Sequence, residues 1–327
     1  MIGYSSLRKF IIPVVACSAL ALVGCGGGDD DDDGGEATPT ATPVPPMDDY
    51  FRITDMVLLD SDSGVDLDGD GTIDNNIDAA LDGISTSLST SIEQALLDNG
   101  IPEECPPDEP TCVSVDSIMS VVNSLLDSVF STESLSDALS QPIEDGDVHY
   151  ILEFAESGAN VELEWFKGEF DNVGYRTTDS LGVQDGALDS AGDGTFGPGD
   201  LTLTFQFTYT DATTGEENTI DIFLTLNDAI TEIDGYNSEV LNDIIFGGAI
   251  SIEELLDLVE EVLNRLQSAI DDIPGQGDPI TLDIDKILSA LDESLSVYAD
   301  IDLDGDGVNE GFSIGIEGSA QHIEPLE

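Results

Sequence analysis

The sequence contains very few basic residues. It holds 7 lysines and arginines against 70 aspartates and glutamates, which gives a formal net charge of −63 at pH 7. Nucleic acid is excluded as a partner, because binding to phosphates requires clustered basic side chains. An anionic lipid surface would repel the folded body for the same reason. Two explanations of the charge stay open: a solvated surface of the kind found in halophilic proteins, and binding of multivalent cations.

The sequence offers little that is typical of a catalytic site. HExxH does not occur, GxSxG occurs only as GFSIG at 311–315, within a segment expected to be a strand and not at a strand-to-helix turn, and no cysteine has the setting of a catalytic thiol. The two histidines are His149, on a strand-like segment, and His322, near the carboxyl end, and we expect structural or solvent-facing roles for both. With so many acidic residues, a pair of carboxylates says nothing about glycoside hydrolysis. We therefore expect that the protein is not an enzyme.

Cysteine is scarce as well, with four in the whole chain. Two of them, Cys105 and Cys112, close the short proline-rich segment ECPPDEPTC. Outside the cytoplasm such a pair is expected to oxidise. A zinc site would need further ligands, and neither histidine lies near this segment in the sequence. The sequence therefore predicts a disulfide between Cys105 and Cys112.

The beginning of the chain is typical of an export signal. A basic pair precedes an apolar run at 10–23, which is shorter than the roughly 20 residues that span a bilayer. The end of the run overlaps the tetrapeptide LVGC at 22–25, whose last residue is Cys25. This tetrapeptide resembles the lipobox of bacterial lipoproteins. The resemblance implies a signal peptide over 1–24, a diacylglycerol thioether on Cys25 and an acyl chain such as palmitate on the new amino terminus. An ordinary signal peptide with an incidental cysteine is the alternative.

Residues 25–47 carry few apolar side chains and include five consecutive aspartates and a Thr/Pro-rich stretch. Such a segment cannot offset the entropy of ordering, so we expect a disordered, acidic tether. Gly26 follows Cys25, and in the lipoprotein sorting scheme this resemblance implies the outer membrane. We expect the body to face the periplasm or the outside of the cell, held to the membrane by the lipid anchor.

Residues 48–327 show regular apolar patterns and are expected to form one globular domain. A period near 3.6 predicts helices over 77–100, 118–129, 251–270 and 287–295, with Asp116 and Ser251 as N-caps. Alternation predicts strands over 51–60, 148–154, 161–170, 201–209, 220–226 and 311–323, and the glycine-rich stretch 185–200 is expected to be a loop. This order favours an α+β fold, an antiparallel sheet packed against several amphipathic helices.

The hexapeptide DLDGDG occurs twice, near the two ends of this domain. Carboxylates at alternate positions, a glycine at position six and a further acid at position nine suit Ca²⁺, which prefers six to eight oxygen ligands. We expect ligands from Asp66, Asp68, Asp70, the Thr72 carbonyl and Asp74 in one loop, and from Asp302, Asp304, Asp306, the Val308 carbonyl and Glu310 in the other. The alternative is a pair of plain acidic turns, since Asp and Gly favour turns in any case.

These segments resemble the calcium loops of EF-hands and of thrombospondin type 3 repeats. They depart from the EF-hand at position twelve, where Ile77 and Ser313 stand in place of a bidentate glutamate. We therefore expect the shorter DxDxDGxx[DE] type of loop, completed by a carboxylate from elsewhere in the chain. The role of calcium would be structural, fixing the two ends of the domain.

Two functions are consistent with the sequence. The first is a lipid-anchored protein of the cell envelope or cell surface, stabilised by calcium, with a structural or binding role. The second is a periplasm- or surface-facing carrier of an apolar ligand, because long amphipathic helices against a sheet can enclose a groove. An apolar cavity would favour the carrier, and a filled core would favour the first function.

Overall fold

The computed structural model describes residues 48–60, 63–69, 71–106, 112–157, 160–210, 217–236, 239–271 and 281–326. The predicted signal peptide, Cys25 and the predicted tether lie outside these ranges. Eight antiparallel strands form a closed barrel in which each strand pairs with its neighbours in sequence order and β8 pairs with β1. The strands are β1 (Asp48–Leu58), β2 (His149–Ser157), β3 (Asn160–Phe170), β4 (Tyr175–Leu188), β5 (Gly194–Thr210), β6 (Glu217–Asp234), β7 (Val240–Ser251) and β8 (Gly311–Ile323).

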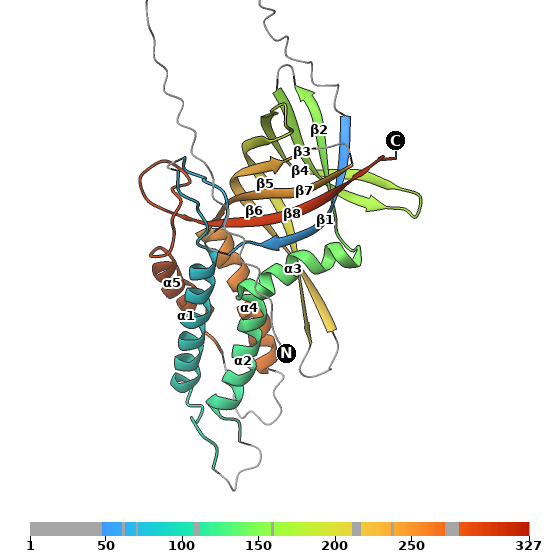
Figure 1. The fold of residues 1–327 in the computed structure, drawn as a ribbon. Helices are drawn as coiled ribbons and strands as arrows, with labels where there is room; N and C mark the ends of the chain where they lie inside the picture. The colour runs from blue at the N-terminus through green and yellow to red at the C-terminus, as the bar shows by residue number, and fades with distance from the viewer. Residues whose placement is uncertain are drawn as a thin grey trace, which may run out of the picture. The chain divides into compact units, whose positions relative to one another are not determined.

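Within the described residues, five helices are inserted into this meander at two points. Three of them lie between β1 and β2: α1 (Ile77–Asp98), α2 (Val115–Val129) and α3 (Thr132–Asp145). The other two, α4 (Ile252–Asp271) and α5 (Ile284–Leu295), lie between β7 and β8. Helix α1 contacts α2 and α5, and α4 contacts α5, while α3 packs on β1 and β5. Figure 1 shows the helices gathered at one end of the barrel, and we call them the helical layer.

The prediction of an α+β sheet packed against helices is therefore wrong. The sheet closes on itself, because β1 and β8 pair from Tyr50 with Ile323 to Leu58 with Ile316. Alternation along each strand marks one apolar face, but it does not say that the first and last strands meet. The stretch 185–200 is also not a plain loop, since most of it belongs to β4 and β5.

Aromatic side chains from opposite walls meet inside the barrel. The rings of Trp165 on β3 and Phe246 on β7 lie 4.9 Å apart, and those of Phe154 on β2 and Phe196 on β5 lie 5.8 Å apart. The buried amide of Gln184 satisfies the polar groups between them: it accepts hydrogen bonds from the Trp165 indole and the Thr231 hydroxyl, and donates one to the Ala229 carbonyl. At these levels the lumen is a packed core.

Strands β5 and β6 continue beyond the point where β4 leaves them. β4 pairs with β5 only from Gly186 to Leu188, whereas β5 and β6 remain paired as far as Thr210 and Glu217. Tyr150 of β2 forms hydrogen bonds with the part of β5 that β4 does not pair with: its hydroxyl donates to the Thr204 carbonyl and accepts from the Thr204 amide. Burial raises the pKa of this hydroxyl to about 12. This extension brings β5 into contact with α2 and α3, and β6 with α4.

The predicted helices are confirmed, with small corrections at their ends. The buried face of α1 consists of Ile77, Ala80, Leu81, Ile84, Leu88, Ile92 and Leu96, which lie on one side of the helix as the period near 3.6 predicts. The N-cap of α2 is Ser114 and not Asp116. The Ser251 hydroxyl accepts from the Glu254 amide, as a capping box at α4 requires. Helix α3 was not predicted; Ser131 caps its start and Pro142 lies inside it.

Candidate metal centre

The two DLDGDG segments lie at the two places where the chain passes between the helical layer and the first and last strands. The first acidic loop, Val65–Asp74, follows β1 and leads into α1, while the second acidic loop, Ile301–Glu310, follows α5 and leads into β8. Because β1 pairs with β8 and α1 contacts α5, the two crossings are neighbours, and Figure 1 shows them on the same side of the domain. Segments 236 positions apart in the sequence thus share one region.

Both loops fold in the same way. Their ends are bridged, Val65 to Asp74 in the first loop and Ile301 to Gly311 in the second. The aspartate at position one accepts from the amides of positions four and six: Asp66 from Gly69 and Gly71, each at 2.8 Å, and Asp302 from Gly305 and Gly307, at 2.8 and 2.7 Å. Asp302 also accepts from the Asp306 amide at 3.2 Å. The acid at position nine accepts from position two in each case, Asp74 from Leu67 at 2.8 Å and Glu310 from Leu303 at 3.0 Å.

Glycine is needed at positions four and six of each loop for a conformational reason. These four residues have φ values of +75°, +87°, +77° and +90°, in the left-handed region where a side chain is strained. The residues are Gly69, Gly71, Gly305 and Gly307. Two left-handed turns in three residues curl the backbone, so that the acids at alternate positions face a common centre.

The curled backbone gathers carboxylates at both loops. In the second loop, oxygens of Asp302, Asp304, Asp306 and Glu310 all lie within 4.8 Å of one another, as do those of Asp66, Asp68 and Asp74 in the first. Ligands of one Ca²⁺ ion, each about 2.3–2.6 Å from it, are at most about 5 Å apart, so both groups fit such an ion. Asp70 lies outside the described residues. Thr72 and Val308 occupy position seven, both exposed, where a main-chain carbonyl ligand is expected.

Position twelve supplies no ligand in either loop, as its residue types suggested. Ile77 is fully buried at the start of α1. Ser313 lies in β8 and its amide and hydroxyl both donate to the Asp300 carboxylate. The carboxylates that gather at the described part of each loop all come from that loop, so the further carboxylate from elsewhere stays a prediction. Burial, and then repulsion from Asp66, raise the pKa of Glu232 on β6.

Hydrogen bonds connect one crossing with the other. The Asn76 amide, directly after the first loop, donates to both the carbonyl and the hydroxyl of Ser313, at 3.0 and 2.9 Å. The Asn76 side chain donates to the Tyr298 carbonyl, just before the second loop. Asp300 accepts from the amide of the same Ser313 and therefore lies between the two loops. Burial, and then repulsion from Asp68 and from Asp300, raise the pKa of Asp74 in spite of the amide bonds that it accepts.

The first loop is also fixed against the outside of the barrel. The Asn75 side-chain amide donates to the carbonyls of Leu59, Asp60 and Ser63 at 2.8–3.0 Å. The Val65 side chain packs over Gly247 of β7. It lies so close that a Cβ atom added at this glycine would be only 2.8 Å from it. Sequence reasoning did not identify Asn75 and Asp300, which flank the two loops, because neither belongs to the repeated pattern of acids. Glu232 is far from both motifs in the sequence.

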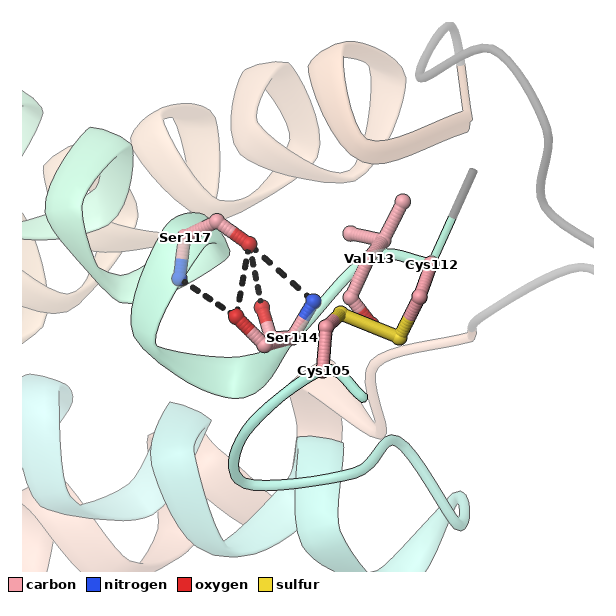
Figure 2. Close-up of a disulfide and its surroundings, with 5 residues drawn as sticks. All are labelled: Cys105, Cys112, Val113, Ser114 and Ser117. Atoms are coloured by element: carbon pink, nitrogen blue, oxygen red, sulfur yellow. Dashed lines mark hydrogen bonds between the residues drawn. A yellow bond between two sulfur atoms is a disulfide. The ribbon is translucent and has the colours of Figure 1, made fainter. Parts of the chain in front are cut away.

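The structure joins Cys105 and Cys112 in a disulfide, with their Cα atoms 5.7 Å apart. The bond lies in the connection between α1 and α2, at the end of the helical layer farthest from the barrel (Figure 1). Figure 2 shows it beside the start of α2, where the Ser114 and Ser117 side chains bond each other and the backbone. This disulfide constrains the connection between α1 and α2, and it is distant in sequence from both acidic loops.

The two histidines lie apart from the acidic loops. His322 on β8 is 3.8 Å from Asp49, whose carboxylate also accepts from the Tyr236 hydroxyl. His149 packs edge-on against Tyr175, and its Nδ1 atom has no hydrogen-bond partner within the described part of the chain. Burial, with help from the nearby Arg52 charge, lowers the pKa of His149.

Among the helices that the structure describes, none has both the length and the apolar character needed to cross a membrane. Comparison with protein-family models, with curated proteins and with solved structures found no match. The functional argument therefore depends on the geometry of this chain itself.

Proposed function

We propose that this protein is a lipid-anchored cell-envelope or cell-surface protein, with a structural or binding role, whose folded domain is stabilised by calcium at the two acidic loops. The observation that carries the proposal is that the same acidic turn is built twice, at the two crossings that join the first and last strands to the helices. An ion in each loop would neutralise converging carboxylates and hold a barrel strand to a helix. The lipid anchor on Cys25 and the outer-membrane location come from the sequence and belong to the same proposal.

The interior of the barrel supports a structural or binding role over transport of an apolar ligand. A carrier needs a cavity lined by apolar side chains. Here Trp165 and Phe246 meet across the lumen, and Phe154 and Phe196 do so at another level. These side chains are fully buried and occupy the space that a ligand would need.

The test is the thermal unfolding of the full chain, measured against Ca²⁺ at fixed ionic strength with Mg²⁺ as the reference ion. At a hundredfold excess over Kd, one site contributes about 2.7 kcal/mol, equivalent to about 5 °C in Tm for a domain of this size. Glu310→Gln and Asp74→Asn remove a charge from each loop, yet their amide oxygens can still accept the Leu303 and Leu67 N–H bonds. Each substitution should abolish about half of the calcium-dependent rise.

The matched control is Glu260→Gln, which makes the same change on the exposed surface of α4. This variant should keep the full calcium response. Equal responses to Ca²⁺ and Mg²⁺, or a full response in the Asp74→Asn Glu310→Gln double variant, would reduce the loops to acidic turns. Radiolabelled palmitate incorporation that survives Cys25→Ser would remove the anchor from the proposal without affecting the calcium result.

A further inference from the structure

The tip of the β3–β4 hairpin, Lys167–Arg176, exposes large apolar side chains. Val173 at its apex is 81% exposed and Phe170 is 50% exposed. Phe170 pairs with Tyr175 across the hairpin, and their rings are 4.9 Å apart. Figure 1 shows this hairpin projecting from the side of the barrel. Apolar and aromatic groups at a projecting tip are a feature of surfaces that bind a partner.

The tip is held in one shape by its own hydrogen bonds. One oxygen of Asp171 accepts from the Val173 and Gly174 amides at 3.1 and 3.3 Å, and the other accepts from the Arg176 guanidinium at 3.3 Å. Asn172 adopts a left-handed φ of 68°. The Leu326 amide bonds the Tyr175 carbonyl at 2.7 Å and so ties the carboxyl-terminal end to the hairpin. Val173 is thus presented on a braced turn.

The charge of the tip differs from that of the rest of the chain. Only five basic residues follow the first ten residues of the sequence, and three of them lie at this hairpin or against it: Arg52, Lys167 and Arg176. Arg52 lies over the Tyr175 ring, 5.3 Å from its centroid. The two basic side chains of the tip balance Glu169 and Asp171, so that the tip has no net charge.

The β4–β5 and β6–β7 turns have a different character. Both connections contain acidic residues and no basic ones; the acids are Asp189, Asp193 and Glu239, and Asp234 ends β6 beside them. The acidic loops add further negative charge where the helical layer joins the barrel. An anionic bilayer repels the chain as a whole, but the β3–β4 tip, which has no net charge, meets less repulsion than these two turns and also offers apolar side chains to bury.

We propose that the β3–β4 tip inserts into the headgroup region of an anionic phospholipid bilayer and sets the orientation of the barrel on the membrane. Val173 and Phe170 would enter the boundary between headgroups and acyl chains, while Tyr175, Lys167 and Arg52 face the lipid phosphates. The proposal builds on the lipid anchor of the proposed function, which would hold the chain near the bilayer. The tip then selects which side of the domain faces the lipid.

The experiment uses tryptophan fluorescence of the full chain added to vesicles of phosphatidylglycerol and phosphatidylcholine that carry brominated acyl chains. The natural Trp165 is buried in the barrel and gives a constant background. Val173→Trp reports on the tip, and Val297→Trp, at a residue that is 79% exposed beside α5, is the matched control. We expect at least a twofold stronger bromine quenching for Val173→Trp than for Val297→Trp, together with a blue shift.

The role of charge is tested by Lys167→Glu in the Val173→Trp background. This change should reduce the quenching in anionic vesicles severalfold and have little effect in pure phosphatidylcholine. Lys286→Glu makes the same change on the exposed surface of α5 and should leave the quenching unaltered.

Flotation of the same samples separates this proposal from the proposed function. If the protein floats with the vesicles but Val173→Trp and Val297→Trp are quenched equally, the lipid anchor is retained and insertion of the tip is overturned. If the protein does not float but Val173→Trp is quenched at high lipid concentration, insertion of the tip is supported and the lipid anchor is contradicted. Stronger quenching of Val297→Trp would assign the membrane-facing side to the helical end and contradict the proposal directly.

Discussion

The barrel and the helical layer build their cores in different ways. In the helical layer, a helix such as α1 contributes one continuous apolar stripe, with seven buried residues, and this stripe packs mainly against neighbouring helices. In the barrel, the core depends on rings that meet across the lumen from strands such as β3 and β7. Loss of one helical contact leaves the rest of a stripe in place, whereas loss of one lumen side chain removes contacts to several strands at once. The barrel should therefore be the less tolerant region.

The largest expected effect is that of Trp165→Ala. The substitution opens a cavity in the lumen and leaves the Gln184 amide without its indole donor, so that we expect a loss of about 3–5 kcal/mol in the free energy of unfolding. Leu88→Ala, at a fully buried position of α1, should cost about 2–5 kcal/mol. Urea denaturation followed by circular dichroism gives both values, and Trp165→Phe separates ring packing from the lost hydrogen bond.

Hydrogen exchange of the same two variants tests the comparison itself. If the two regions respond separately, Leu88→Ala accelerates exchange in the helices while the barrel strands keep their protection. Equal acceleration throughout both regions in both variants would mean that they unfold as one unit, and the distinction between them would then concern packing alone.

A smaller effect is expected on removal of the disulfide. Cys105 and Cys112 are separated by 7 positions, and the entropy of closing such a loop corresponds to about 2.5 kcal/mol. Replacement of both by serine should lower the free energy of unfolding by about this amount and accelerate exchange at the end of α1 and the start of α2. Reduction of the wild-type protein should reproduce the result, and an unchanged stability in both experiments would show that the connection is held by other contacts.

What could be predicted from the sequence differs between these regions for a physical reason. Leu88 and Ile92 belong to a stripe that is complete within one segment, so the period of the apolar residues identified α1 and its buried face. The contact of Trp165 with Phe246 joins residues 81 positions apart, and no local pattern specifies it. Pairing of β1 with β8, which closes the barrel, is a longer-range case of the same kind.

The candidate metal centre shows the same limit. The spacing of DLDGDG identified the acids that the described parts of both loops bring together, because these acids follow one another along the chain. Asn75 and Asp300 flank the loops in the sequence, but their partners, Leu59 after β1 and Ser313 of β8, are supplied by the fold. The effect of Asp66 on Glu232 of β6 likewise depends on the fold. The lipid anchor and the calcium ions remain predictions. The projecting hairpin tip was not predicted, since Val173 becomes apical only when Phe170 pairs with Tyr175.

The smallest expected effect concerns pH and belongs to the barrel. Asp234, at the end of β6, has its pKa raised by a side-chain hydrogen bond with Asp193 and by repulsion from Asp193 and Asp243. Its folded-state pKa lies above the unfolded value, so the native state binds this proton more tightly. Stability from this pair is therefore gained as the pH falls through the folded-state pKa, and at neutral pH the pair is repulsive. Asp234→Asn should raise Tm slightly at pH 7, and the gain should shrink towards pH 4.

The same measurement on Asp257→Asn, an exposed position of α4, provides the matched change in the helical layer. Both variants remove one negative charge from a chain of net charge −63, and only Asp234 lies beside the carboxylates that raise its pKa. A gain that is larger for Asp234→Asn and that disappears on acidification identifies the local carboxylate pair as its source. Equal gains in both variants, reduced alike by added salt, would instead assign the effect to the overall charge, which acts on the barrel and the helical layer without distinction.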